Sequence, residues 1–333
     1  MPSPDSIPPP HSPDGTLQRR KHLSRWLGFA IGIALLSAAA WAVYRDRAHL
    51  DTAFTNLRAL PLYMTGLLVV LPCLNWLITS AMFSQLLRQA PDEVRFVRSP
   101  RKAEMIELIG AAWLANYAPI RPGLFGRIAY HKRFNGIPIA RTIHSIVCAI
   151  GCGGIGIVFL LAVCWLNSVW FPARASGPTI AAAFIISPLV FMVVAALVVG
   201  RFRPQWKFFG LACAIRYVDL LVWLARYALV FWIAGKPLNL PQAAAVAAVS
   251  QAAMLFPLVG NGLGVREFAI GLAGAALPTW FVGDAADPIA RNAALTADLF
   301  NRAGELIAAI PVGLTCGLLL MRRQAVQRTN DPA

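Results

Sequence analysis

The stretch WLANYAPIRPGLFGRIAYHKR, residues 113–133, decides how the fold is read. It begins as an apolar membrane segment and ends in a cluster of positive charge. Between the two, Pro119, Pro122, Gly123 and Gly126 interrupt a helix. Backbone that is not helical at membrane depth is tolerated only where it is buried in protein or lines a wet cavity. The interruption therefore predicts a cavity.

The rest of the chain is apolar enough to surround such a segment with membrane helices. Of its 333 residues, 58% are hydrophobic and only 14% are charged. Six mostly apolar stretches approach the roughly 20 residues that cross a ~30 Å hydrocarbon core. These stretches are 26–44, 60–83, 142–166, 179–200, 211–234 and 289–320. The sequence predicts an all-α polytopic membrane protein.

Three regions are expected along the chain. Residues 1–24 are rich in proline and basic residues and should form a disordered cytoplasmic tail. Residues 25–322 should form the transmembrane domain, and 323–333 a short cytoplasmic tail. A cleaved signal peptide is the alternative for the N-terminal part, because 38–40 mimics a cleavage site. The long leader and the long apolar run 26–44 favour an uncleaved anchor.

The charge balance indicates the expected partner. The net charge of +15 would suggest nucleic acid in a soluble protein, but here the basic residues lie between hydrophobic stretches. An anionic membrane lipid is therefore expected as partner, and nucleic acid is not. No acidic residue lies between Leu108 and Val218. The six cysteines lie in or near apolar runs without histidine–cysteine ligand spacing, so neither a metal site nor a disulfide framework is expected. No cofactor is expected either.

Two apolar segments are too short or too interrupted to be ordinary spans. If 105–120 turns back, the basic segments 121–141 and 201–216 lie on the inside with the N-terminus, as the positive-inside rule favours. A second interrupted pair, 241–258 and 268–277, enters from the opposite side. We expect six transmembrane helices plus two oppositely oriented re-entrant hairpins, with both termini cytoplasmic. Inverted-repeat transporters build midplane sites in this way.

Ionisable residues occur inside the predicted spans. Asp298, Arg302 and Glu305 lie at i, i+4 and i+7 on one face of the last span, and Asp219 and Arg226 are seven apart in an earlier one. A charge at the bilayer centre costs ~3 kcal/mol, so these side chains should face a cavity or each other. Two interpretations stay open. They form an internal ion-pair network, or they bind a headgroup and couple transport to protons.

The interruptions carry charges of their own. Arg266 and Glu267 lie at the second one. Arg121 and Arg127 lie among the helix breakers of the first and are expected to bind an anion, because arginine contacts phosphate in bidentate fashion. Arg133, by contrast, is read as ordinary positive-inside charge.

Nucleotide chemistry and enzyme chemistry are not expected. GCGGIG at 151–156 matches a dinucleotide fingerprint, but it lies in a predicted span without a preceding strand, so close helix packing explains it. No Walker-type loop occurs. A membrane enzyme is the alternative class, yet the histidines are scattered. The only candidate carboxylates, Asp46 and Asp51 in the loop 45–59, lie among arginines.

The two interrupted segments, in this order, resemble the flippase-like membrane family that includes the transmembrane part of bacterial lysylphosphatidylglycerol synthase. The first family pattern runs N-x-x-x-P-x-R-x-G-E-x-x-R. The matching residues are Asn116, Pro119, Arg121, Gly123 and Arg127, with one residue fewer between the first two.

The second family pattern is a proline followed by G-L-G-V-x-E. Its matches are Pro257, Gly262, Leu263, Gly264, Val265 and Glu267. Arg302 resembles an arginine that recurs in the last span, and the likeness covers about 25–322. Leu124 stands where the family has an acidic residue, and Asn261 replaces a glycine.

The resemblance implies movement of a lipid between the leaflets of a bacterial inner membrane. The chain ends at Ala333, so the synthase's soluble domain is expected to be missing, which implies transport and not synthesis. The implied substrate is an anionic phospholipid or a polyprenyl- or isoprenoid-type lipid. Its headgroup should dock near Arg121, Arg127 and Arg266. Alternatives are an anionic small-solute secondary transporter or an accessory subunit of a lipid-modifying complex.

Two sets of residues follow from these expectations. The expected substrate-binding residues are Asn116, Pro119, Arg121, Gly123, Arg127, Gly262, Gly264, Arg266, Glu267 and Arg302. The carboxylates that would couple transport to protons are Asp219, Asp298 and Glu305, with Glu267 as a further candidate. Passive exchange without coupling is the alternative.

Overall fold

The computed structural model describes most of the predicted transmembrane domain. The described residues are 37, 54–59, 61–89, 100–118, 121–170, 178–254, 265–281 and 288–330. The expected tail at 1–24 and most of the predicted first span 26–44 lie outside them. Of the expected C-terminal tail 323–333, residues 323–330 continue the last helix, and only 331–333 lie outside the described residues. So do three expected site residues, which are Pro119, Gly262 and Gly264.

The described residues are helical or connect helices, and none of them is in a strand. The helices are α3 (Leu62–Arg88), α4 (Lys102–Ala115), α5 (Pro122–Phe134), α6 (Ile139–Trp170), α7 (Pro178–Phe202), α8 (Pro204–Ile233), α9 (Leu240–Met254), α10 (Val265–Phe281) and α11 (Pro288–Asn330). Proline at the first helical position begins both α5 and α8, where its missing N–H would have no intrahelical partner.

Four described helices are long and apolar enough to cross a membrane. They are Leu62–Arg88, Ile139–Leu166, Pro204–Ile233 and Ala293–Ala325, and Ile186–Phe202 is a shorter apolar helix. An all-helical protein compatible with several passes through a membrane is thereby confirmed. The helices also extend beyond the apolar stretches, since α8 begins at Pro204 and not at Leu211.

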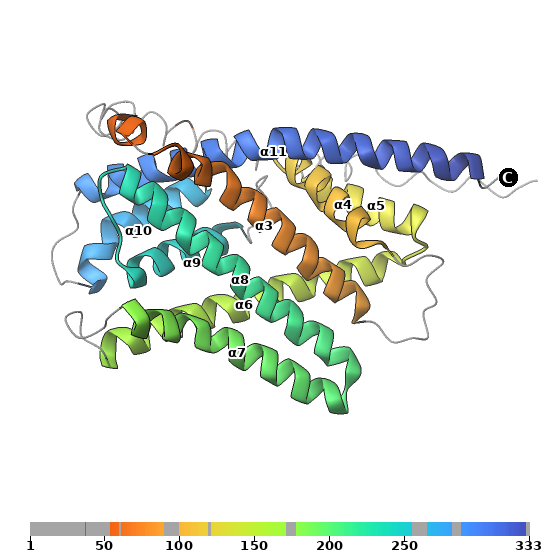
Figure 1. The fold of residues 1–333 in the computed structure, drawn as a ribbon, viewed down its shortest axis with the longest axis horizontal. Coiled ribbons are helices and arrows are strands. Elements are labelled where there is room, and N and C mark those ends of the chain that lie inside the picture. The colour runs from red at the N-terminus through yellow and green to blue at the C-terminus, as the bar shows by residue number, and fades with distance from the viewer. Residues whose placement is uncertain are drawn as a thin grey trace, which may run out of the picture.

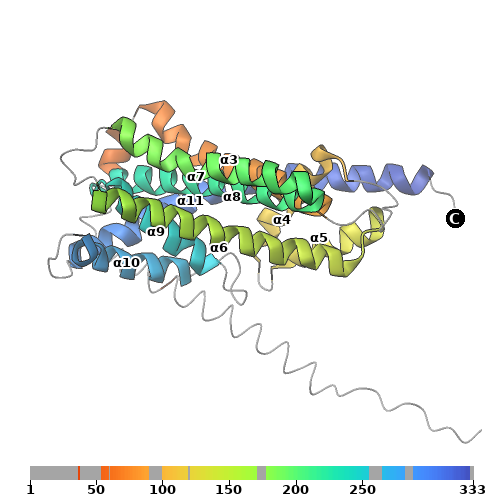
Figure 2. The same ribbon diagram turned by 90° about the horizontal axis from the view of Figure 1, so that it is seen from below.

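In Figure 1, α3, α7 and α8 slope the same way, α6 crosses α8 with the opposite slope, and α11 follows the molecule's long axis; Figure 2 shows the same bundle from below. α8 lies centrally and packs against both α3 and α7, while α11 packs along α4 and α10. Tight approaches hold these pairs together. A Cβ at Gly210 on α8 would lie 2.5 Å from the Ala196 Cβ on α7, and one at Gly156 on α6 would lie 2.7 Å from Leu220 Cδ1 on α8. The GCGGIG segment is thus helical, and Gly156 packs closely against a neighbouring helix, as expected.

The two interrupted segments form two pairs of short helices, α4 with α5 and α9 with α10. They lie toward opposite ends of the molecule, α4 and α5 at the end that carries the C-terminus (Figure 1). α4 ends at Ala115, earlier than the apolar run suggests, with Asn116 as its C-cap residue. α5 folds back on α4 so closely that a Cβ at Gly123 would lie 2.2 Å from the Ala112 carbonyl oxygen.

Candidate functional site

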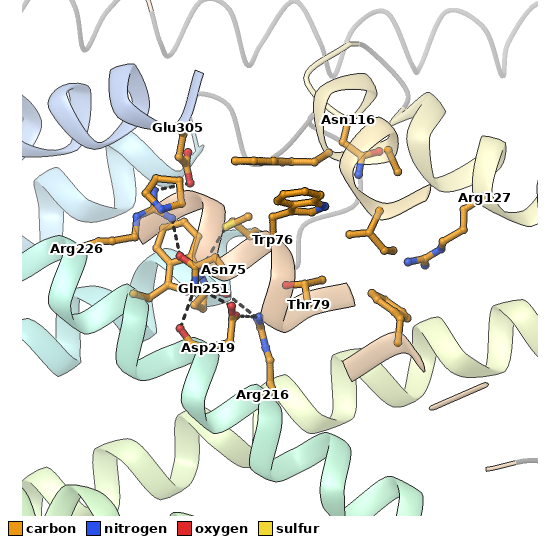
Figure 3. Close-up of a pocket in the computed structure, with 17 residues that line it drawn as sticks. Asn75, Trp76, Thr79, Asn116, Arg127, Arg216, Asp219, Arg226, Gln251 and Glu305 are labelled. Carbon is orange, nitrogen blue, oxygen red and sulfur yellow. Dashed lines mark hydrogen bonds and ion pairs between the residues drawn. The ribbon is translucent and has the colours of Figure 1, made fainter. Parts of the chain in front are cut away.

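A polar cavity of about 270 Å³ lies where α3, α4, α5, α8, α9 and α11 meet. Its labelled lining residues in Figure 3 are Asn75, Trp76, Thr79, Asn116, Arg127, Arg216, Asp219, Arg226, Gln251 and Glu305. Both short-helix pairs therefore contribute to it, since Arg127 belongs to α5 and Gln251 to α9.

One face of α8 supplies most of the charge. Arg216, Asp219, Trp223 and Arg226 are spaced by three, four and three residues, which places them on one side of the helix. Arg216 forms an ion pair with Asp219 and donates a 2.6 Å hydrogen bond to Gln251 Oε1. This part of the wall is internally neutral.

Asn75 of α3 connects the two charged ends of that face. Its Nδ2 donates to Asp219 Oδ1 at 2.7 Å, and its Oδ1 accepts from Arg226 Nη1 at 3.0 Å. Arg226 lies 3.8 Å from the centre of the Trp223 ring and pairs with Glu305 at 2.7 Å. Asp219 and Arg226, which the sequence suggested as a pair, are thus joined through an amide and not directly.

Behind the cavity wall, α10 and α11 share a buried ion-pair network. Arg266 lies 3.2 Å from Asp298 Oδ1 and 3.1 Å from Glu305 Oε2. Arg302 pairs with Glu267 at 2.6 Å. These five residues are 5% exposed or less. Every one of them has an opposite charge within 4 Å, as the first interpretation of the charged spans requires.

Arg127 stands in a different environment. It is 6% exposed, and its guanidinium lies 3.9 Å from the centre of the Phe83 ring. Its Nε lacks a hydrogen-bond partner, and none of the described carboxylates pairs with it. The carboxylates of α4 are engaged elsewhere, because Glu107 pairs with Arg323 at 2.7 Å and Glu104 accepts from the Tyr130 hydroxyl at 3.0 Å.

The Arg127 side chain extends from α5 into the cavity, on the side away from Arg226 and Glu305 (Figure 3). Burial lowers the pKa of Arg127 to about 10, so the group still carries its charge at neutral pH. One turn along α5, burial and then the charge of Arg127 lower the pKa of His131 to about 4. His131 is therefore neutral at pH 7, and α5 presents one buried positive charge here.

Arg121 links the two interruptions. Its φ of 49° is in the left-handed region, which is uncommon for a residue other than glycine. Its Nη2 donates a 3.0 Å hydrogen bond to the carbonyl oxygen of Met254, the last residue of α9. The start of α5 and the end of α9 therefore meet in the interior.

The structure distributes the described site residues over four places. Asn116, Arg127, Asp219 and Glu305 line the cavity, and Gly123 lines a hollow beside it. Arg266, Glu267, Asp298 and Arg302 form the network behind its wall. Arg121 lies between the interruptions, while Pro119, Gly262 and Gly264 fall outside the described residues.

Several lining residues were not expected as site residues. Asn75, Trp76 and Thr79 come from α3, and Gln251 comes from α9. The only sequence signal for Asn75 is an amide within a long apolar run. Gln251 is the one residue with a long polar side chain in the alanine-rich part of α9.

Two further findings bear on the chemistry of the site. Among the described side chains, no three His, Cys, Asp or Glu residues lie close enough to hold a metal ion. No protein-family model, curated protein or solved structure matches this chain. The functional argument therefore depends on the geometry of the cavity.

Proposed function

We propose that this protein is a lipid translocator that moves an anionic phospholipid, or another lipid with an anionic headgroup, between the leaflets of a membrane. In this proposal Arg127 binds the headgroup inside the cavity. Arginine suits the task because its planar fork contacts two phosphate oxygens at once.

The observation that carries the proposal is the charge of the interior. The described residues of the cavity wall and the adjoining network include five arginines and four carboxylates. They are Arg127, Arg216, Arg226, Arg266 and Arg302, with Asp219, Glu267, Asp298 and Glu305. The positive charge left over is that of Arg127. A buried cation without a counter-charge is costly. An anion that binds beside Arg127 would provide the counter-charge that the described residues lack.

The fold supports passage through the membrane if the short-helix pairs are re-entrant. Six spans, the first at 26–44, would then surround two hairpins that enter from opposite sides, with both termini in the cytoplasm. The opposite placement of α4–α5 and α9–α10 in Figure 1 supports this topology. A polar cavity between two such hairpins lowers the cost of moving a headgroup past the hydrocarbon core.

Coupling to protons would use a carboxylate that substrate and water can reach. Of the proposed coupling residues, Asp219 and Glu305 line the cavity, whereas Glu267 and Asp298 lie in the network behind it. Asp219 and Glu305 are therefore the stronger candidates. A lipid-exchange rate that changes with a pH gradient would support coupling. A rate that is the same with and without the gradient would indicate a passive scramblase.

Leaflet exchange of fluorescent phosphatidylglycerol in proteoliposomes tests the proposal, with dithionite quenching the outer leaflet. We expect Arg127→Gln to slow exchange at least tenfold. The matched control is Arg133→Gln, which removes an exposed arginine from the same helix and should leave the rate unchanged. Size-exclusion profiles of the three proteins establish that each is folded.

Three results would count against the proposal. Wild-type exchange in a folded Arg127→Gln protein would remove Arg127 from the headgroup site. Equal loss in both variants would point to a general effect of charge at the membrane surface. No lipid exchange, combined with uptake of a soluble anion such as inorganic phosphate, would instead favour the anionic solute transporter.

A further inference from the structure

A second hollow adjoins the polar cavity and shares part of its wall. It measures about 230 Å³ and lies between α3, α5 and α6. The residues common to both spaces are Thr79, Phe83, Ala112, Asn116, Arg127 and Arg216. Arg127 therefore stands at the junction between them.

Apolar side chains line part of the second hollow. They are those of Leu124 on α5 and Ile146 and Ile150 on α6, and Ile150 is 48% exposed. Its neighbour Val147 on α6 is 59% exposed. Since α6 is long and apolar enough to span the membrane, this exposed apolar surface faces the acyl chains of the bilayer.

Small residues keep the passage between α6 and the interior open. Ala149 and Gly153 are the α6 residues that line it deeper inside. A Cβ at Gly153 would meet nothing nearer than Arg216 Nε at 3.6 Å, which is an ordinary contact distance. Met82 of α3, only 3% exposed, also lines the hollow.

We propose that the hollow between α5 and α6 is a lateral portal that holds the acyl end of a phospholipid while Arg127 holds its phosphate. This inference depends on the proposed function and specifies its substrate. The ligand is an amphiphile with one negative charge, such as a phosphodiester lipid, because one uncompensated cation stands where the polar and apolar spaces meet. A soluble anion would need the polar cavity but not an apolar opening to the bilayer.

Photocrosslinking tests the portal independently of transport. The probe is phosphatidylglycerol with a diazirine on one acyl chain, incorporated in proteoliposomes, and labelled residues are located by mass spectrometry. We expect label on Met82, which lines the hollow and is only 3% exposed, besides background on Val158, which is 66% exposed on α6. Arg127→Gln should reduce the Met82 label at least fivefold and leave the Val158 label unchanged.

A blocking variant separates the portal from the headgroup site. Ala149→Trp fills the hollow and should remove the Met82 label, and Ala149→Phe serves if the larger side chain prevents folding. The matched control is Val158→Trp, which adds the same bulk on a lipid-exposed position of α6. Exchange should fall with the first substitution and persist with the second.

The outcomes distinguish this inference from the proposed function. The portal is overturned if both Arg127→Gln and Ala149→Trp leave the label on Met82 unchanged. It is also overturned if the wild type shows no label on Met82. If the wild type still exchanges lipid in either of these cases, the protein is a translocator that lipids enter by another route. If Ala149→Trp and Arg127→Gln remove the label but the wild type exchanges no lipid, the portal stands as a lipid-binding site and translocation fails.

Discussion

The two short-helix pairs each place an arginine in the interior, but in opposite electrostatic settings. Arg266 of α10 is fully buried and contacts Asp298 and Glu305. Arg127 of α5 is almost as buried, yet its near neighbour is the Phe83 ring. A buried charge with partners holds helices in place, whereas one without them is available to a ligand. The comparison separates a structural arginine from the one proposed to bind the headgroup.

The pairs also differ in how they are held. α10 is joined to α11 by ion pairs from Arg266 to Asp298 and from Glu267 to Arg302. α5 is held against α4 by close backbone approach at Gly123, where there is no room for a side chain. The position of α10 therefore depends on ion pairs, and that of α5 on close packing.

The largest expected effect concerns stability at the two arginines. Arg266→Met removes one partner from a buried ion-pair network and leaves Asp298 short of a counter-charge, which should lower the free energy of unfolding by about 3–5 kcal/mol. Arg127→Met loses only the contact with the Phe83 ring and relieves a desolvated charge. It should change stability by less than ~1 kcal/mol.

Unfolding in mixed micelles, followed by tryptophan fluorescence, measures both variants under the same conditions. A cost for Arg127→Met as large as that for Arg266→Met would show that Arg127 has a structural counter-charge in the folded protein. The distinction between the two arginines would then be wrong, and with it the headgroup site.

The second prediction tests whether shape holds the first pair. Gly123→Ala puts a Cβ 2.2 Å from the Ala112 carbonyl oxygen, so α5 must move away from α4 at a cost of about 1–3 kcal/mol. Gly126→Ala is the matched control, because nothing lies within 4 Å of its Cβ. That variant should gain ~0.5–1 kcal/mol from helix propensity.

Thermal unfolding in one detergent compares these two variants with the wild type. Gly123→Ala should also slow lipid exchange, since Gly123 and Arg127 lie one turn apart on the helix that moves. Equal gains in stability from both substitutions would mean that α5 does not pack on α4 at this distance.

The sequence predicted the elements that create this comparison. Proline and glycine near 119–126 and the glycine-rich segment after 258 indicated two interruptions. The structure ends α4 at Ala115 and α9 at Met254, a few residues before each of them. The periodicity of Asp298, Arg302 and Glu305 put them on one face of α11. These are local properties, which residue type and spacing determine.

Partners across the interior could not be predicted in the same way. The choice between an ion-pair network and a ligand site depends on which arginine meets which carboxylate. Arg266 and Asp298 meet because α10 packs on α11, and Asn75 reaches Asp219 because α3 packs on α8. Periodicity gives the face of a helix but not its neighbour. That Arg127 pairs with none of the described carboxylates is likewise visible only once α3, α4 and α5 are placed.

The smallest expected effect concerns Arg121, where the two regions touch. Arg121→Ala and Arg121→Gly both lose the hydrogen bond to the Met254 carbonyl oxygen, so their difference isolates the cost of the backbone conformation. At φ 49° a residue with a Cβ is strained and glycine is not, which predicts that the glycine variant is more stable by ~1 kcal/mol. Unfolding in the same micelles measures the difference.

Equal stability would mean that the chain leaves the left-handed conformation once the hydrogen bond is gone, so that the contact with α9 imposes the turn. A clear advantage for glycine would mean that the turn persists without the contact, and that the first short-helix pair fixes its own geometry independently of the second.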